Sequence, residues 1–276
     1  MAPILDRIPH FDERSRQYAV RRLLPDRVVR TKTIWGVPPD VLDQGNEGAC
    51  VGFGWSGELA AAPVTATQLP GAPTINNPYA MDVYHKAQVE DRAMGNNWPE
   101  GASVLAGAKA VTKMGVVSEY RWAFGINDLI DTLCAHGPVV LGINWYDGMF
   151  YPDNRGVLSV TGPVVGGHCL MAYGFVPNDP VFGSDMVWLR NSWGATWGIN
   201  GTAYIRSRDL SRLLSEQGEC CVPTDTAAAP APAPTPSDAA DVALAQVVKP
   251  WAATRHYGQT RTVANAFNTW LSAKHL

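Results

Sequence analysis

Hydrophobic residues recur at helical spacing in three segments of the first half of the chain. In residues 103–114 the apolar side chains share one face, and Gly115 stands where a helix would stop. Residues 126–136 repeat this pattern, and residues 48–62 combine a face of small side chains with a terminating Pro63. The pattern predicts three helices, of which the one at residues 48–62 can approach its neighbours closely.

After residue 138 the period of the apolar pattern changes. Short apolar or alternating runs, separated by Gly, Pro and Asn, predict strands over residues 139–144, 169–175, 186–191 and 202–206. Helices in the first part of a domain and strands in the second are typical of an α+β fold with two segregated lobes. We therefore predict this fold class, with an antiparallel sheet in the second lobe.

A change of composition near residue 222 predicts the end of the folded body. The following residues carry repeated prolines among Ala, Thr and Ser, which cannot hold a helix and have little apolar surface to bury. We divide the chain into a body at residues 1–222, with residues 1–40 as an N-terminal lead-in segment, a Pro/Ala-rich linker at residues 223–248 and a tail at residues 249–276.

The tail is predicted to form an amphipathic helix. Four large apolar side chains fall on one stripe at helical spacing: Val263, Phe267, Trp270 and Leu271. A helix of this size cannot fold alone. It can dock on its own body, on a second copy of the chain or on a protein partner, and the sequence leaves all three open.

Composition and charge exclude several classes of function. With 46% hydrophobic and 17% charged residues among 276, the chain can bury a core and is too apolar for wholesale disorder. The net charge of −3 offers no basic surface for nucleic acid, and no apolar run approaches the about 20 residues of a membrane span. The charged residues near the N-terminus do not resemble a secretory signal, so we expect a cytoplasmic protein by default, with a phage particle as the alternative.

Cysteine usage points to one reactive thiol. The five cysteines are an odd number in a long chain, which argues against a disulfide framework, and no Cys-x-x-Cys pair indicates a zinc site. We expect neither a metal nor a cofactor. At least one thiol needs a chemical explanation, and the candidates are Cys50, Cys134, Cys169, Cys220 and Cys221.

Cys50 has neighbours that suit a nucleophile. An ordinary thiol has a pKa near about 8.5, and only its thiolate attacks a carbonyl carbon. Cys50 falls where the helix at residues 48–62 should begin, so backbone N–H groups and the helix dipole favour the anion. An imidazolium nearby would favour it further and could then protonate a leaving amine. His168, on a predicted strand, is our candidate for this group.

Three short segments, in this order, resemble the active-site segments of papain-like cysteine peptidases. They are residues 44–50 (QGNEGAC), 166–169 (GGHC) and 191–201 (NSWGATWGING), and the third is the most specific. Taken singly, each has an ordinary explanation, because an isolated cysteine is more often a small core residue. Together they are hard to obtain by chance. The resemblance covers most of the body and implies the papain-like two-lobed α+β fold, with the nucleophile helix in the helical lobe and His and Asn in the sheet lobe.

The resemblance also implies roles for further residues. Asn191 would orient the His168 ring, and Trp193 would cover this pair from water. Gln44, six residues before Cys50, would donate its side-chain amide to the oxyanion together with the Cys50 backbone N–H. The family's substrate-binding surface maps onto Gly101, Gly167, Trp193 and Trp197.

The sequence departs from the family pattern in three places. Val51 stands where the family usually has Trp, and Glu47 stands where secreted members have a disulfide cysteine. Only 49 residues precede Cys50, fewer than the usual inhibitory pro-segment of the family. We therefore expect a member without such a segment, of bacterial or phage-like type, whose activity is restrained by other means.

Three functions fit these observations. The first is a peptidase that cleaves polypeptides through a thioester on Cys50. The second is an amidase acting on cell-wall or isopeptide bonds. The third is an assembly or virion component that retains the peptidase fold and is tethered by its tail.

Overall fold

The computed structural model describes residues 4–63 and 73–224. Most of the predicted linker and the whole predicted tail lie outside these ranges. The helices are α1 (Cys50–Leu59), α2 (Asn77–Ala93), α3 (Val104–Lys113), α4 (Ile126–Ala135) and α5 (Ser207–Ser215), and short 3₁₀ turns are η1 (Glu13–Tyr18), η2 (Val20–Arg22) and η4 (Asp147–Met149). The strands are β1 (Thr33–Ile34), β2 (Glu119–Trp122), β3 (Val139–Tyr146), β4 (Val164–Asp179), β5 (Ser184–Arg190), β6 (Thr202–Arg206) and β7 (Glu219–Thr224).

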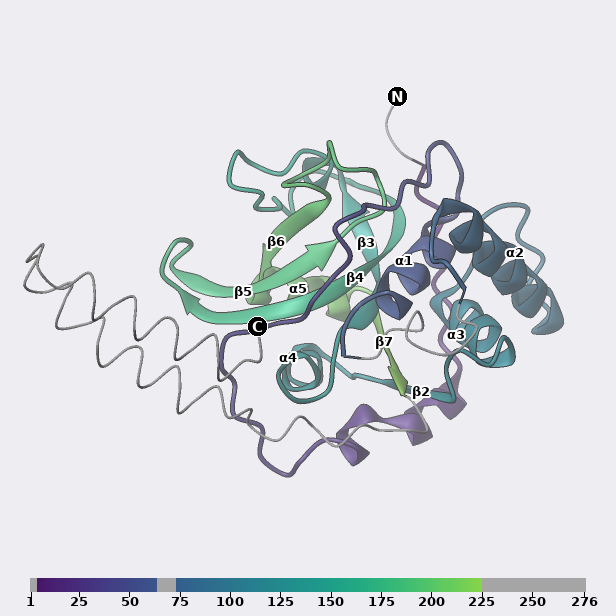
Figure 1. The fold of residues 1–276 in the computed structure, drawn as a ribbon, viewed down its shortest axis with the longest axis horizontal. Helices are drawn as coiled ribbons and strands as arrows, with labels where there is room; N and C mark the ends of the chain where they lie inside the picture. Colours follow the sequence, from purple (N-terminus) through teal and green to yellow (C-terminus); the bar gives the residue numbers. More distant parts are fainter. Residues whose placement is uncertain (1–3, 64–72, 225–276) are drawn as a thin grey trace, which may run out of the picture. The chain divides into compact units, whose positions relative to one another are not determined.

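The strands form one antiparallel sheet in the order β2-β7-β3-β4-β5-β6, and β1 adds to β4. Figure 1 shows β5 and β6 on one side of the body and helices α1 to α3 on the other, with β2 and β7 below α3. The register of β3 places Gly142 beside Cys169 of β4 on one side and beside Glu219 of β7 on the other. Three residues distant in the sequence thus meet near the centre of the sheet.

Each lobe has its own hydrophobic core. One core is built on the sheet and on α4 and α5, with Leu129, Leu133, Leu210 and Leu213 fully buried. The other joins α1, α2 and α3, and it includes Cys50 and Cys169. The described part of the chain contains no helix long and apolar enough to cross a membrane.

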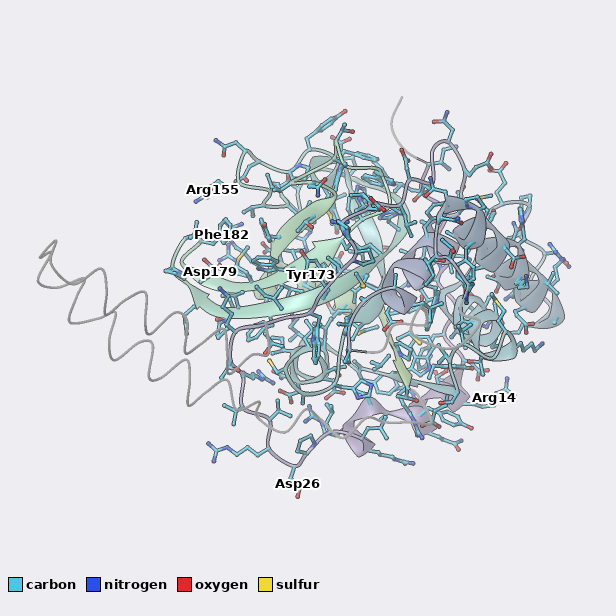
Figure 2. The ribbon with its side chains drawn as sticks, in the orientation of Figure 1. Arg14, Asp26, Arg155, Tyr173, Asp179 and Phe182 are labelled. Atoms are coloured by element: carbon cyan, nitrogen blue, oxygen red, sulfur yellow. The ribbon has the colours of Figure 1, made fainter. Side chains whose placement is uncertain are left out.

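The end of the sheet farthest from α1 to α3 carries surface contacts. Figure 2 shows Arg155, Asp179 and Phe182 together at this end, where the Arg155 guanidinium lies 5.3 Å from the centroid of the Phe182 ring. Tyr173, nearer the middle of β4, shares a hydrogen bond of 3.2 Å with the Thr202 hydroxyl. The long β4–β5 hairpin is therefore fixed at its tip and at its middle by different kinds of contact.

Helix α1 packs closely because its small side chains permit it. Nine of its ten residues are buried. A Cβ atom added to Gly52 would stand 2.4 Å from the Ala80 carbonyl oxygen and 2.5 Å from the Tyr84 nitrogen of α2. This contact confirms the prediction of close packing for the helix at residues 48–62.

The predicted α+β class is confirmed, and so are the helices at α1, α3 and α4. Helix α3 begins at its cap residue Ser103, whose hydroxyl accepts a hydrogen bond from Ala106 N, and Gly115 follows its end with a φ of +74°. The four predicted strands correspond to β3, β4, β5 and β6, with β3 and β4 longer than predicted.

The pattern analysis missed α2, α5 and three strands. Helix α2 had readable signals, because Asn76 caps it, Pro78 lies in its first turn, and its buried residues Ala80, Val83, Tyr84 and Ala87 follow a helical period. The charged residues between them concealed that period. Strands β2 and β7 are short, and they are stabilised by pairing with each other and with β3.

The N-terminal lead-in segment, for which no helix or strand was predicted, contains η1, η2 and β1, and β1 pairs with β4. At the other end of the body, β7 continues to Thr224, so the first two residues of the predicted linker belong to a strand. All five cysteines are free, and Cys220 and Cys221 are buried in β7.

Candidate active site

Cys50 is the first residue of α1, as the sequence predicts. Its side chain is completely buried, at the junction between the helical lobe and β4. The backbone N–H groups of Asp6 and Cys169 donate toward its sulfur. Because Cys169 is the neighbour of His168 on β4, this contact brings the thiol to the strand that carries the imidazole.

His168 and Asn191 form a buried hydrogen-bonded pair. His168 Nε2 lies 2.7 Å from Asn191 Oδ1, and the same oxygen accepts a hydrogen bond of 2.8 Å from Ser192 N. The Asn191 amide oxygen has no proton and can only accept hydrogen bonds. The ring must therefore donate to it, and Nε2 carries the proton. In the neutral ring Nδ1 is then the acceptor, and it has no partner among the described residues. The pair therefore offers one basic nitrogen.

Two tryptophans enclose the imidazole. The Trp193 ring centroid lies 4.6 Å from that of His168, and the Trp145 centroid lies 4.8 Å from it, edge to face. Trp197 packs against both tryptophans and donates to the Phe150 carbonyl at 3.0 Å. Trp193 packs against the His168 ring, which is completely buried. Trp145 was not predicted as a site residue. It lies on β3, and only the pairing of β3 with β4 places it beside His168.

Gln44 links the two lobes beside this pair. Its backbone N–H donates to Ser192 O at 2.9 Å, and its side-chain carbonyl accepts from the Ser192 hydroxyl at 2.9 Å. Its amide nitrogen donates to Glu47 O at 2.8 Å and to Ile4 O at 3.3 Å. A backbone carbonyl of the N-terminal segment therefore contacts the donor assigned to the oxyanion.

Residues 4–8, here named the N-terminal strap, lie between the two lobes over Cys50. The strap pairs with the helical lobe because Ala102 N donates to Asp6 O at 3.2 Å and Ile8 N donates to Ala102 O at 3.0 Å. It pairs with the sheet lobe because Arg7 N donates to Gly167 O at 3.0 Å. Its backbone thereby uses the two surfaces that the sequence analysis assigned to substrate, at Gly101 with its neighbour Ala102 and at Gly167.

The Arg7 side chain points from the strap into the sheet lobe. Its Nη2 lies 2.5 Å from Glu219 Oε2 and donates to Gln217 O at 2.7 Å, and its Nε lies 3.1 Å from the same Glu219 oxygen. The side-chain exposures are 0% for Arg7 and 6% for Glu219. Burial raises the pKa of Glu219 to about 6, although the Arg7 charge and hydrogen bond oppose the shift. Sequence patterns gave no signal for either residue.

In the strap-bound structure, the Cys50 thiol and the His168 imidazole are both uncharged. Burial raises the pKa of Cys50 to about 11 despite the two N–H donors, and burial lowers the pKa of His168 to about 4 despite the Asn191 hydrogen bond. We expected the helix terminus and an imidazolium to favour the thiolate. In the strap-bound structure desolvation of both groups outweighs these effects, so the thiol keeps its proton.

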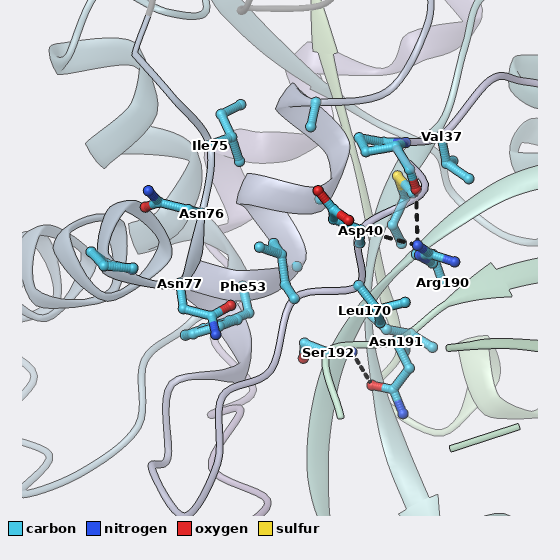
Figure 3. Close-up of a pocket in the computed structure, with 18 of the residues that line it drawn as sticks. Val37, Asp40, Phe53, Ile75, Asn76, Asn77, Leu170, Arg190, Asn191 and Ser192 are labelled. Carbon is cyan, nitrogen blue, oxygen red and sulfur yellow. Dashed lines mark hydrogen bonds between the residues drawn. The ribbon is translucent and has the colours of Figure 1, made fainter. Parts of the chain in front are cut away.

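A cavity of about 410 Å³ lies beside this site and not over the thiol. Figure 3 shows its lining from the loop before α1, α1 itself, the start of α2, the middle of β4 and the end of β5, with Asn191 and Ser192 directly after β5. Neither Cys50 nor His168 lines it. Arg190 closes one side by donating to the carbonyls of Pro38 and Asp40. The space over Cys50 is filled by the strap.

Among the predicted residues, His168 and Asn191 contact each other directly, Gln44 contacts Ser192 beside Asn191, and Cys50 contacts Cys169 beside His168. Gly101 and Gly167 contact the strap, whereas Trp193 and Trp197 pack around His168 and remain predictions as substrate contacts. Glu47 is exposed and contributes only its backbone carbonyl. Over residues 4–63 and 73–224, no cluster of His, Cys, Asp or Glu could hold a metal ion.

Comparison with known proteins gives consistent matches. The sequence profile described as papain family cysteine protease matches residues 92–228, which include His168 and Asn191. An uncharacterized peptidase C1-like protein of Acanthamoeba polyphaga mimivirus is 22% identical over 203 residues, covering 58% of this chain. The alignment covers 62% of that relative, so less than two thirds of its length is matched.

Two solved structures share the fold. Xylellain, a cysteine protease from Xylella fastidiosa, has a TM-score of 0.58 at 18% identity, covering 82% of this chain and 98% of its own. The proform of Amb a 11, a cysteine protease and ragweed pollen allergen, has a TM-score of 0.54 at 20% identity, covering 75% of this chain and 69% of its own. At identities this low, the similarity shows the two-lobed fold alone.

Proposed function

Because this chain belongs to the papain family of cysteine peptidases, we propose that it hydrolyses peptide bonds through a thioester formed on Cys50. The observation that supports this proposal most directly is the buried hydrogen bond of 2.7 Å between His168 Nε2 and Asn191 Oδ1. It leaves Nδ1 of the neutral ring as a base next to the strand position that contacts the thiol. No hydrogen bond joins His168 Nδ1 to Cys50 in the strap-bound state, so the proposed proton transfer requires the two groups to come within hydrogen-bond distance after the strap leaves.

The proposed reaction uses the protein's own groups. His168 Nδ1 takes the Cys50 proton, and the sulfur attacks the carbonyl carbon of the scissile peptide. The resulting oxyanion accepts hydrogen bonds from the Gln44 amide and the Cys50 backbone N–H. When the tetrahedral intermediate collapses, the C–N bond breaks and the imidazolium protonates the leaving amine. A water molecule, activated by the neutral imidazole, then hydrolyses the thioester and regenerates the thiol.

The strap has to leave before a substrate binds. Its backbone already uses Ala102 and Gly167, and its Ile4 carbonyl accepts from the Gln44 amide. Once the strap leaves, water reaches Cys50 and His168, so the desolvation that separates their pKa values decreases. We therefore propose that the strap-bound state is latent. In this proposal the strap restrains the peptidase activity. The sequence analysis expected a restraint of a different kind from the family's long pro-segment, but it did not predict that residues 4–8 provide it.

The direct test compares hydrolysis of a fluorescent casein by the full chain, by Cys50→Ala and by Cys134→Ala. Loss of the nucleophile should lower the rate by about 10⁴-fold or more. Cys134 is a half-buried thiol on α4, and its removal should leave the rate unchanged. Unchanged hydrolysis by Cys50→Ala would refute the proposal.

The two alternatives keep their own tests. No contact within the described residues favours a cell-wall or isopeptide bond over an ordinary peptide bond, and parallel digestion of peptidoglycan and casein separates these substrates. The tethered assembly component depends on residues 249–276, which lie outside the described residues. Its test is co-purification of partners with and without residues 225–276.

A further inference from the structure

We propose that the cavity beside the active site is a binding site for a small zwitterion with an apolar side chain, that is, a free apolar amino acid. Arg190 holds the carboxylate of this ligand, and Asp40 holds its ammonium group. The inference goes beyond the proposed peptidase function and does not depend on it.

The first argument is the position of the cavity along α1. The helix begins at Cys50, whereas the cavity is lined by Gly54, Gly57 and Ala60, which come four, seven and ten residues later. At a rise of 1.5 Å per residue, these positions lie about 6–15 Å along the helix axis from the nucleophile. No residue of the strap lines the cavity. The cavity is therefore separate from the space over Cys50 that a peptide substrate has to enter.

The second argument is that α1 leaves this space open. A Cβ atom added to Gly57 would meet no atom within 4 Å, and the φ of Gly57 is not positive. Neither close packing nor backbone conformation requires a glycine there, although glycine is unfavourable inside a helix. The other walls are largely apolar and include Val37, Val41, Leu42, Ile75, Leu170 and Met171. Such a surface favours an apolar side chain.

The third argument is that two opposite charges line the cavity and do not pair with each other. The half-buried Arg190 guanidinium donates to backbone carbonyls alone within the described residues, at Asn200 and at residues 38–40. Burial lowers the pKa of Arg190, so an anion beside it would stabilise its charge. The Asp40 carboxylate is exposed and points away from Arg190 in Figure 3, and no ion pair joins it to another described residue.

A free amino acid can satisfy both groups at once. Its carboxylate and its ammonium group are attached to one carbon atom, so a single ligand can pair with Arg190 and with Asp40 while its side chain contacts the apolar walls. A simple carboxylic acid would face the like charge of Asp40, and a simple amine would face that of Arg190. The charges therefore select a zwitterion, and the apolar walls select its side chain.

Isothermal titration calorimetry with the full chain tests this selectivity. L-Leucine should bind with a Kd in the millimolar range. N-acetyl-L-leucine lacks the ammonium group and L-leucinamide lacks the carboxylate, so each should bind about 10-fold more weakly. Glycine, which has no side chain to bury, should also bind at least about 10-fold more weakly. Absence of leucine binding, or equal affinity for the three leucine compounds, would overturn the proposal.

Variants of the lining separate the charge from the cavity. Asp40→Asn should weaken leucine binding by about 10-fold and remove the preference for leucine over N-acetyl-leucine. Asp43→Asn is the matched control, because Asp43 is exposed in the same loop, accepts from Gly45 N and does not line the cavity. Its affinity should equal that of the parent protein. Equal weakening in both variants would contradict the role of Asp40.

Gly57→Leu places a side chain in the cavity and should abolish binding, while its melting temperature shows that the fold is retained. Arg7→Ala weakens the strap over the substrate groove and should leave the affinity unchanged. Tighter binding by Arg7→Ala, together with undiminished binding by Gly57→Leu, would place the ligand in the groove and overturn the proposal. Because Cys50→Ala should also bind leucine with the affinity of the parent protein, failure of the peptidase proposal would leave this result unaffected.

Discussion

Two sets of ion pairs hold the N-terminal lead-in segment against the body, and their surroundings differ. In the first, here named the groove anchor, Arg7 and Glu219 are almost completely buried. In the second, here named the surface anchor, Arg21 and Arg30 contact Asp131 of α4 at 2.6 and 2.7 Å while remaining 41% and 38% exposed. The distances are similar, so the environment decides what each contact contributes.

Access to solvent decides how much free energy is lost when one partner of each anchor is removed. Water can solvate Arg21 or Arg30 when either loses its partner. The Asp131 side chain is only 10% exposed, but it keeps one arginine when the other is removed, so each pair contributes about 0–1 kcal/mol. The groove anchor has no such alternative, because a single buried charge left behind costs several kcal/mol. The strap is therefore held by a contact in which each buried charge depends on the other.

The largest expected effect comes from breaking the groove anchor on one side. Glu219→Leu leaves the Arg7 guanidinium buried without its counter-ion and should lower the free energy of unfolding by about 3–5 kcal/mol in urea denaturation. Replacing both partners, in Arg7→Met/Glu219→Leu, should restore stability to within about 1 kcal/mol of the parent protein. A double variant as unstable as the single one would show that the ion pair itself stabilises the fold.

The next largest effect concerns the thiol beneath the strap. With its pKa at about 11, Cys50 should react with iodoacetamide at pH 7 at least about 100-fold more slowly than an ordinary thiol. Arg7→Ala weakens the strap and should raise this rate by about 100-fold, measured by mass spectrometry of the labelled peptide. Arg30→Ala, at the surface anchor, is the matched control and should leave the rate unchanged. Equal labelling in all three proteins would contradict the strap's protective role.

The two anchors should also respond to pH with opposite signs. The native pKa of Glu219 is raised to about 6, so the native state binds its proton more tightly than the unfolded state between about pH 4.5 and 6. Stability due to Glu219 is therefore present at low pH and decreases by about 2 kcal/mol as the pH rises through this window. Glu219→Gln should remove this decrease.

Asp131 behaves in the other direction. Burial raises its pKa, but hydrogen bonds from Arg30 and Arg21 outweigh burial and lower the pKa below its ordinary value of 3.8. Its contribution is therefore present above that value and is lost as the pH falls through the lowered pKa. The difference in unfolding free energy between the parent protein and each variant, Asp131→Asn or Glu219→Gln, should be measured by urea denaturation from pH 3 to 8. The two differences should change with pH in opposite directions, and changes in the same direction would contradict the assignment.

The smallest effect is expected at the surface anchor itself. Arg30→Ala should cost less than about 1 kcal/mol of unfolding free energy, and 0.5 M salt should remove most of that difference because exposed charges are screened. The same salt should leave the groove-anchor variants unchanged. A salt-insensitive loss above about 2 kcal/mol in Arg30→Ala would remove the distinction between the anchors.

Much of the chemistry was readable along the chain because it is local. Cys50 was predicted at a helix start because a small-residue helical pattern follows it, and it is the first residue of α1. Asn191, Ser192 and Trp193 stand together in one segment, so their arrangement around His168 follows once the two strands pair. Helix α2 could have been found from its cap and its buried period, and its charged face concealed it.

The strap and its pocket were not predictable in the same way. Arg7 and Glu219 are 212 positions apart, and nothing near either residue distinguishes it from other charged residues. Gly142 looks like an ordinary strand glycine until β3 lies between β4 and β7. The protonation states were also missed, because they depend on how completely the strap excludes water from Cys50 and His168.

By itself, the sequence determined the α+β class, three of the helices, four of the strands and the candidate residues for thiol chemistry, because these depend on local period, caps and short motifs. Only the tertiary structure decided that the chain's own N-terminus covers that set and that Arg7 fills a pocket ending at Glu219. The physical reason is that burial sets the cost of a charge, and burial arises where distant segments meet.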